Sequence, residues 1–358
     1  MAAEASLKAW LALSLTRGLG GENARRLLKE FGSPGAVFAA PISSLKSVVK
    51  TDVAAEISRG IADDAVGPAL SWLEDNNNHI VTLADSDYPQ ALLNISDPPL
   101  LLYVKGRLDL LNLPAQAVVG SRSATPQGIN NAEAFAKSLS DAGLCIISGM
   151  AHGIDAAAHR GALRGQGSSI AIVGTGLDIV YPSANRDLAH ALAQQGTLVS
   201  EFPLATPPLA ANFPRRNRLI SGMSLGCLVV EASLQSGSLI TARLALEQGR
   251  DVFAIPGSIH APQSKGCHAL LKQGAKLVET AQDILEELGG MLASPAQPSD
   301  SEGADSALLE HLGFDPVDVD TLSLRCGLTI AELSAMLLTL ELSGRICVLP
   351  GGLYQRIH

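Results

Sequence analysis

The pattern of apolar and polar positions divides the chain into three parts, of which the first looks helical. From about residue 5 to residue 75, apolar residues recur at three- and four-residue spacing, as in SLKAWLALSL. This spacing is typical of amphipathic helices that pack one face into a small core. We therefore expect a small helical domain over residues 1–78.

The middle part alternates between two periods. HIVTL (79–83) and LLLYV (100–104) predict short strands, separated by turn residues and prolines. Beyond residue 110, apolar runs such as QAVV, CIIS and IAIV alternate with helical stretches of ten or more residues. Strands that are apolar on both faces and are joined by helices predict an α/β domain, with a doubly wound, mostly parallel sheet over residues 79–290.

The last part begins with a change of composition. Residues 291–303 are rich in Pro, Ser and Asp and show no periodicity, which predicts a linker. Residues 304–358 then give three helical patterns and a hairpin, RICVLPGGLYQRI, with a Pro-Gly-Gly turn. Three helices followed by a hairpin indicate a winged-helix-like domain.

Composition supports a folded chain and narrows its location. Hydrophobic residues make up 47% of the 358 residues and charged residues 17%, so a sizeable core is expected. No apolar run approaches the roughly 18 residues that span a bilayer, so we expect no membrane span, and the first residues do not resemble a secretory signal. Five scattered cysteines without a CxxC pair favour reduced thiols and a cytoplasmic location.

The charge is unevenly distributed along the chain. Net charge is −9, but residues 115–290 contain 13 basic and 13 acidic residues, whereas residues 291–358 contain 3 and 9. General coating of nucleic acid is therefore not expected, and a local anion site in the middle part stays possible.

Glycine-rich turns follow the predicted strands. In an open parallel sheet, ligands bind beyond the carboxyl ends of the strands, where glycines let backbone amides approach an anion. Each such turn alone could be a simple connection, but their shared position favours a phosphate-binding rim. The residues that we assign to it are Gly120, Ser121, Arg122, Ser148, Gly149, Gly174, Gly237, Ser238 and Thr241.

An arginine cluster, NFPRRNRLISG, follows the strand TLVSEFP. We expect Phe213, Arg215, Arg216 and Arg218 in a loop, with a helix starting at RLISG. Arginines grip phosphate and aromatic rings stack on bases, so these residues suit a single-strand groove. The favoured assignment puts Arg216 or Arg218 on DNA and Phe213 against a base, and leaves Arg215 most exposed.

Two other interpretations of the basic residues stay open. The arginines could form an internal network with Glu201, Glu231 or Asp178. In the N-terminal part, RGLGGENARRLL resembles a helix-hairpin-helix turn that could hold a DNA phosphate, but a plain packing bundle is favoured.

Signals for catalysis are weak. VGTGLDIVYP lacks the third glycine of a dinucleotide fingerprint, and there is no GxxxxGK[ST]. His and Cys spacings predict no metal site, and no GxSxG elbow occurs. Asp155 and Glu201 could act as acids or bases, and so could His152 and His159, for which a structural role is favoured. We expect no cofactor and no catalytic residues.

Six ordered motifs identify a resemblance. VVGSRSATPQG, ISGMAHGIDAAAHRGAL, IAIVGTGLDIVYP, SEFPLATPPLAANFPRRNRLISG, VVEASLQSGSLITARLALEQGRDVFAIPG and GCHALLKQGA span about residues 115–277. Together they resemble the DprA/Smf family of bacterial DNA-processing proteins. The bridge before them is similar to the family's entry segment, and the two flanking domains resemble modules that vary within the family.

The resemblance implies an extended Rossmann fold without dinucleotide chemistry and no enzymatic activity. It also implies binding of single-stranded DNA with little sequence preference, a homodimer through the Rossmann domain, and loading of the RecA recombinase during natural transformation. By motif, Arg122 would grip a phosphate, and Phe213 with Arg216 and Arg218 would line the pocket. Alanine at Arg122, or at Arg216 and Arg218 together, should then abolish binding without unfolding the chain.

Two alternatives come from other classes. Rossmann-type nucleotide phosphoribohydrolases have a similar sheet, but their catalytic Glu follows the motif threonine by three residues. Here Leu244 occupies that place after Thr241, which disfavours the enzyme. The other alternative is a scaffold for DNA-uptake proteins that uses the acidic C-terminal domain.

Overall fold

The computed structural model forms two compact units, Met1–Gly290 and Met291–His358. The structure describes residues 2–60 and 63–292 of the chain, and further residues between 308 and 356. Those further residues are 308, 311–312, 317–326, 328–329, 333, 336–337, 340, 346–349 and 353–356. Of the predicted linker, residues 291 and 292 end a helix, and the rest lies outside the described residues.

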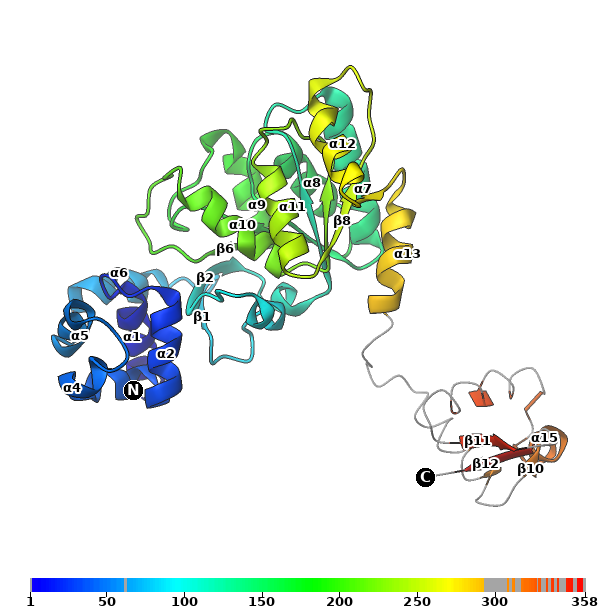
Figure 1. Ribbon diagram of the computed structural model, residues 1–358, viewed down its shortest axis with the longest axis horizontal. Coiled ribbons are helices and arrows are strands. Elements are labelled where there is room, and N and C mark those ends of the chain that lie inside the picture. Colours follow the sequence, from blue (N-terminus) through cyan, green and yellow to red (C-terminus); the bar gives the residue numbers. More distant parts are fainter. Residues whose placement is uncertain are drawn as a thin grey trace. The chain divides into compact units, whose positions relative to one another are not determined.

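The N-terminal residues form a bundle of helices, as the spacing predicted. Leu11, Leu27 and Ile57 fill its centre and share one apolar cluster with Leu101 and Tyr103 of the adjoining sheet. The bundle therefore belongs to the same compact unit as the sheet (Figure 1). Its helices are α1 (Ala2–Leu15), α2 (Gly21–Phe31), α3 (Pro34–Ala39), α4 (Ile42–Leu45), α5 (Thr51–Ser58) and α6 (Asp63–Trp72).

A nine-stranded sheet forms the centre of the first unit, in the order β1-β2-β6-β5-β4-β3-β7-β8-β9. Strand β2 is antiparallel to both of its neighbours, β1 and β6. All other neighbouring pairs in this order, from β6 through β3 to β9, are parallel. Strands β4, β5 and β6 lie on one side of β3, and β7, β8 and β9 lie on the other side. The strand order therefore reverses between β3 and β7. The strands are β1 (Asn78–Thr82), β2 (Leu101–Gly106), β3 (Ala115–Val119), β4 (Cys145–Ser148), β5 (Ser169–Ile172), β6 (Thr197–Ser200), β7 (Gly226–Val229), β8 (Asp251–Ala254) and β9 (Lys276–Leu277).

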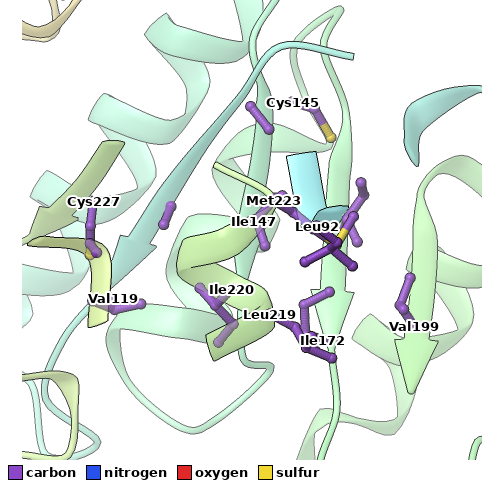
Figure 2. Packing of buried hydrophobic residues seen from close by; sticks show 14 of the residues in the cluster. Leu92, Val119, Cys145, Ile147, Ile172, Val199, Leu219, Ile220, Met223 and Cys227 are labelled. Atoms are coloured by element: carbon purple, nitrogen blue, oxygen red, sulfur yellow. The ribbon is translucent and has the colours of Figure 1, made fainter. Parts of the chain in front are cut away.

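Helices cover both faces of the parallel strands because successive strand residues point to opposite sides. Ile147 and Ile172 face Leu219 and Ile220 of α10, where side chains from the strands and the helix meet (Figure 2). The alternate residues, such as Ile146, share a second apolar cluster with residues of α7, α8 and α13. The helices are α7 (Pro126–Asp141), α8 (Ile154–Ala162), α9 (Arg186–Gln195), α10 (Asn212–Gly222), α11 (Ser238–Glu247), α12 (Lys265–Lys272) and α13 (Ala281–Leu292), with short 3-10 turns η1 (Gln90–Asn94), η2 (Leu108–Asn112), η3 (Ser183–Asn185) and η4 (Pro262–Ser264).

The second unit has its own small core and a three-stranded antiparallel sheet. Strands β11 (Ile346–Leu349) and β12 (Leu353–Arg356) form the predicted hairpin, and β10 (Val317–Asp318) pairs with β12. Helix α15 (Val319–Cys326) supplies Leu322 to the core. Across the parts of the chain that the structure describes, no helix is long and apolar enough to cross a membrane.

Candidate functional site

A cavity of about 610 Å³ lies at the carboxyl edge of the sheet, around the point where the strand order reverses. Its walls come from the turn after β3, the turn after β7, and the first turns of α10 and α11. This is the position at which an open α/β sheet binds ligands. Among the predicted site residues, those that line it are Gly120, Ser121, Arg122, Phe213, Arg216, Gly237, Ser238 and Thr241.

Helix α10 starts earlier than the sequence pattern suggested. It begins at Asn212, so Phe213 and all three arginines lie on the helix, and the predicted loop with a helix starting at RLISG was wrong. The side-chain amide of Asn212 donates to Gly174 O (3.0 Å), which joins the first turn of α10 to the loop after β5. Because successive helical residues are rotated by about 100°, the arginines point in different directions.

Arg216 points into the protein and lies beneath the cavity. It is 4% exposed and donates through Nη1 to Gly149 O (2.8 Å) and to Ile172 O. Burial lowers the pKa of Arg216 to about 10, although the nearby Asp155 carboxylate opposes this effect. A side chain at Gly149 would collide with the guanidinium, since an added Cβ would lie 2.3 Å from Arg216 Nη2. Gly149 therefore serves the close packing of Arg216.

Arg218 and Arg215 both contact Glu201. Arg218 is largely buried, pairs with Glu201 and donates to Asp97 O (2.7 Å). The Glu201 side chain is 3% exposed, and burial raises its pKa while Arg218 and Arg215 oppose the shift. Arg215 is 59% exposed, lies 3.3 Å from Glu201 and stacks on Phe202. Of the three arginines it is therefore the most exposed, as the sequence predicted.

Glu201 is thus the acid that holds the internal arginine network. Glu231 instead accepts from the backbone N–H (2.9 Å) and hydroxyl (2.6 Å) of Thr125, at the start of α7. Asp178 accepts from Ala205 N (2.9 Å). The predicted internal network therefore forms through Glu201, and the carboxylates of Glu231 and Asp178 hold backbone turns instead.

Arg122 and Phe213 meet at the mouth of the cavity. The Arg122 guanidinium lies 5.5 Å from the centroid of the Phe213 ring, at cation–π distance. Tyr181 also lies next to Phe213, with ring centroids 5.6 Å apart. Arg122 is exposed and, among the described residues, has no ion-pair partner. Its charge is therefore available to an anion.

The backbone amides of the rim are less available than the glycine-rich turns suggested. Ser121 N donates to Glu231 O (2.7 Å), Met150 N to His159 Nε2 (3.3 Å), and Gly176 N to Thr206 O (3.0 Å). Some N–H groups of these turns are therefore already bonded within the protein and are not presented to a ligand. Side chains of the cavity wall can supply further polar contacts.

Hydroxyl groups also line the cavity. Ser236 and Ser238 share a hydrogen bond (2.7 Å) where α11 begins, and Ser121 is a further lining residue. Ser148, in contrast, donates to Val118 O (2.6 Å) and does not line the cavity. Ser148 is therefore a buried support for β3.

Asp155 supplies a carboxylate to the cavity wall. It accepts from Ala151 N (3.3 Å), and burial raises its pKa against the opposing charge of Arg216. Among the residues that the structure describes, no group of His, Cys, Asp and Glu could hold a metal ion. The observed partner of Asp155 is a turn amide, which fits a structural role.

His159 has the structural role that the sequence favoured. Its ring is fully buried, and its Nδ1 lies 2.7 Å from Ser169 Oγ, which itself donates to Ile146 O. Ser169 must then accept from Nδ1–H, which leaves Nε2 to accept from Met150 N. Burial lowers the pKa of His159 to about 3, with Arg216 and Arg160 adding to the effect.

This histidine should make the protein sensitive to mild acid. The unfolded chain takes up a proton near pH 6.5 and the folded chain does not, so stability is lost as pH falls from about 6.5 towards 3. Between pH 7 and pH 5 we expect the wild type to lose about 2 kcal/mol of unfolding free energy through this group. Urea unfolding of wild type and His159→Gln at both pH values measures the difference; equal pH dependence in the two proteins would exclude this role.

Comparison with known proteins identifies the family. The model of the family described as DNA recombination-mediator protein A (DprA) matches residues 79–289. The chain belongs to the DprA family. Residues 292–352 match the model of the DprA winged helix domain, which confirms the winged-helix prediction for the C-terminal part.

Curated DprA relatives are similar over most of their length. Protein Smf of Escherichia coli (strain K12) is 46% identical over 305 residues, which cover 82% of this chain and 81% of that protein. The DNA processing protein DprA of Streptococcus pneumoniae is 48% identical over 206 residues, covering 58% and 73%.

Two solved structures are similar in fold. DNA processing protein A of Streptococcus pneumoniae has a TM-score of 0.69 at 38% identity, covering 78% of this chain and 97% of that one. DNA processing protein A of Helicobacter pylori, whose structure concerns its single-stranded DNA binding mode, has a TM-score of 0.54 at 32% identity, covering 59% and 95%. These DprA structures, with the nine-stranded sheet, confirm the predicted extended Rossmann-like fold.

Sequence reasoning missed several residues that line the cavity, above all Tyr181 and Asn217. Tyr181 lies in the stretch VGTGLDIVYP, which the sequence pattern marked only as an incomplete dinucleotide-binding fingerprint. An aromatic residue in a loop at the carboxyl end of a strand was the signal that could have found it.

Proposed function

We propose that the cavity binds single-stranded DNA without sequence preference, and that the protein protects this DNA and loads RecA onto it during transformation and recombination. The observation that carries the proposal is the arrangement of Arg122, Phe213 and Tyr181: a cation that, among the described residues, has no ion-pair partner, beside two aromatic rings. The similar protein of Helicobacter pylori has a described single-stranded DNA binding mode, which supports the same ligand.

The arrangement distinguishes single strands from duplex for a physical reason. Aromatic rings stack on any unpaired base, because every base has a π-face, so such sites tolerate all sequences. In a duplex these faces are already stacked on neighbouring base pairs. Phosphate contacts alone would not make this distinction, since both forms of DNA carry phosphates.

Each predicted residue takes a role that its surroundings support. We assign Arg122 to a phosphate, Phe213 to a base, and Arg215, on the outer face of α10, to a peripheral phosphate contact. The cavity wall supplies hydroxyl and small-residue contacts from Gly120, Ser121, Gly237, Ser238 and Thr241. Arg216 supports the floor, and the remaining predicted residues hold the surrounding loops: Ser148, Gly149, Gly174 and Arg218.

Gly174 shows how such support works. An added Cβ at Gly174 would lie 3.2 Å from Phe213 Cδ1, so a side chain there would push the ring. We infer that Gly174 contributes to binding by leaving Phe213 its position at the cavity mouth, without touching DNA itself.

The wider function rests on the family. The matching model names a recombination mediator, and similar proteins are named DNA processing proteins. We propose a homodimer through the Rossmann-like domain, RecA as a partner, and action in the cytoplasm. The C-terminal part, with 3 basic and 9 acidic residues after residue 290, suits a protein contact better than DNA.

We also propose that the protein is not an enzyme. Leu244 stands on α11 where the phosphoribohydrolase pattern has its catalytic Glu, and the carboxylate of Asp155 is engaged by a turn amide. Incubation with AMP and other nucleoside monophosphates tests this assignment. Release of free base that depends on Asp155 or Glu201 would overturn it.

The binding proposal is tested with a dT oligomer of roughly 30 nucleotides and a duplex of the same length. We expect the wild-type protein to shift the single strand strongly and the duplex weakly, and the affinity to fall as salt rises. With RecA added, the protein should speed filament formation on the oligomer. Equal affinity for the two DNA forms would contradict the proposed site.

A further inference from the structure

Tyr181 is an exposed aromatic side chain that the core does not require. It lies in the loop between β5 and α9, lines the cavity and is 42% exposed. Its ring centroid lies 5.6 Å from that of Phe213 at an interplanar angle of 44°. Among the described residues, no hydrogen bond involves its hydroxyl. A ring that served only to fill the core would be buried, so its exposure calls for another role.

The loop that carries Tyr181 is fixed from several sides. Thr175 Oγ1 donates to Ile179 O (3.1 Å), and Gly176 N donates to Thr206 O (3.0 Å). After Tyr181, Asn185 Nδ2 donates to Met150 O (2.9 Å), and both Thr175 and Asn185 are buried. The ring is thus held in place before any ligand arrives, which lowers the entropic cost of binding to it.

The spacing of the two rings determines how bases could meet them. A base stacked between two rings needs about twice the ~3.4 Å stacking distance, or roughly 7 Å. Tyr181 and Phe213 are too close and too tilted for one base to enter between them. Two bases can instead be received, one against each ring, with the base at Phe213 lying beside the Arg122 guanidinium.

We propose that Tyr181 and Phe213 form a two-step stacking platform that holds two neighbouring bases of one DNA strand. Arg122, beside Phe213, then holds the phosphate at the edge of this platform. The inference rests on the proposed binding of single-stranded DNA and adds a second base contact to it. It requires the aromatic ring of Tyr181 and not its hydroxyl.

Three variants separate stacking from simple packing. Tyr181→Phe keeps the ring, Tyr181→Leu keeps an apolar side chain but has no π-face, and Phe213→Leu is the matched change at the other ring. We expect Tyr181→Leu to weaken binding of a dT oligomer about tenfold, and Tyr181→Phe to bind like wild type. An abasic oligomer of the same length should bind wild type and Tyr181→Leu equally.

A base-specific readout completes the test. A dT oligomer with a single 2-aminopurine loses fluorescence when that base stacks on a ring, and Tyr181→Leu should reduce the quenching. Equal dT binding by Tyr181→Leu and wild type, or an equal loss on the abasic strand, would overturn the inference. If Phe213→Leu alone lowers affinity, the proposed function stands and the Tyr181 platform fails. If wild type binds neither oligomer, the proposed function itself fails.

Discussion

Arg122→Ala is expected to weaken binding of a single-stranded dT oligomer by about 30-fold, close to 2 kcal/mol, while the protein stays folded. Arg122 is exposed, lies over the Phe213 ring and, within the described residues, has no acidic partner. Its removal therefore leaves no buried group unpaired in the free protein. The loss should appear in the complex, where a charge-assisted contact to phosphate disappears.

Two further variants show whether the loss belongs to this position. Arg59→Ala also removes one positive charge, from an exposed side chain beside Glu56 in the N-terminal bundle, and should bind like wild type. Arg122→Lys keeps the charge but lacks the planar fork, so its affinity should lie between wild type and Arg122→Ala. Measurement by fluorescence anisotropy at two salt concentrations should also show a smaller salt dependence for Arg122→Ala. Wild-type affinity in Arg122→Ala would remove the arginine from the site.

Arg216→Ala is expected to lower the free energy of unfolding by about 3–5 kcal/mol. The Arg216 guanidinium is buried under the cavity and holds the carbonyls of Gly149 and Ile172, with Asp155 close by. Alanine would leave two carbonyls without their donor, and would remove the charge that favours ionised Asp155. The loops on the cavity floor should loosen, and DNA binding should fall as a consequence.

Arg215→Ala is the matched control for this prediction, since it removes the neighbouring arginine of the same helix. Arg215 is exposed and Glu201 keeps Arg218 as its partner, so the loss of Arg215 should change stability by no more than about 1 kcal/mol. Urea unfolding of both variants gives the comparison. If Arg216→Ala were as stable as Arg215→Ala, the buried contacts of Arg216 would not support the floor.

These expectations replace one that came from the sequence. Alanine at Arg216 and Arg218 was expected to abolish binding without unfolding the chain, and burial makes this unsuitable as a test of DNA contact. Arg218 is paired with the buried Glu201 and bonded to Asp97 O, so its removal also leaves a buried charge without its partner. Arg122 is the arginine whose removal can test contact with DNA alone.

The position of the site could be predicted because parallel strands end at one edge. Gly120, Ser121 and Arg122 follow β3, and Gly237 and Ser238 follow β7, so strand periodicity alone placed them together. The direction of each side chain could not be predicted in the same way. It depends on the residue at which a helix begins, and the start of α10 at Asn212 decided which arginine is buried.

The availability of backbone groups also lay beyond the sequence. A glycine-rich turn shows that the backbone can approach a ligand, but not whether its amides are already bonded. Ser121 N is bonded to Glu231 O, a contact between turns that are far apart in the chain. Tyr181 was missed for a similar reason, because its proximity to Phe213 depends on the folding of two separate segments.

The N-terminal bundle shows another contact of this kind. Arg25 of α2 pairs with Asp97 (2.8 Å) and donates to Pro98 O (2.9 Å), in the segment before β2. Asp97 O also accepts from Arg218 of α10. The bundle therefore contacts the same segment that holds the helix of the cavity, which gives Arg25 a structural role near the GLGG turn.

The most direct test of the site is the location of a crosslink. A dT oligomer that carries 5-iododeoxyuridine crosslinks to aromatic side chains on which the modified base stacks, and mass spectrometry then identifies the peptide. We expect crosslinks at Phe213 and Tyr181, which are lost with Phe213→Leu and Tyr181→Leu. Crosslinks confined to the N-terminal bundle or to the second unit would contradict the proposal that the cavity at the carboxyl edge of the sheet binds single-stranded DNA.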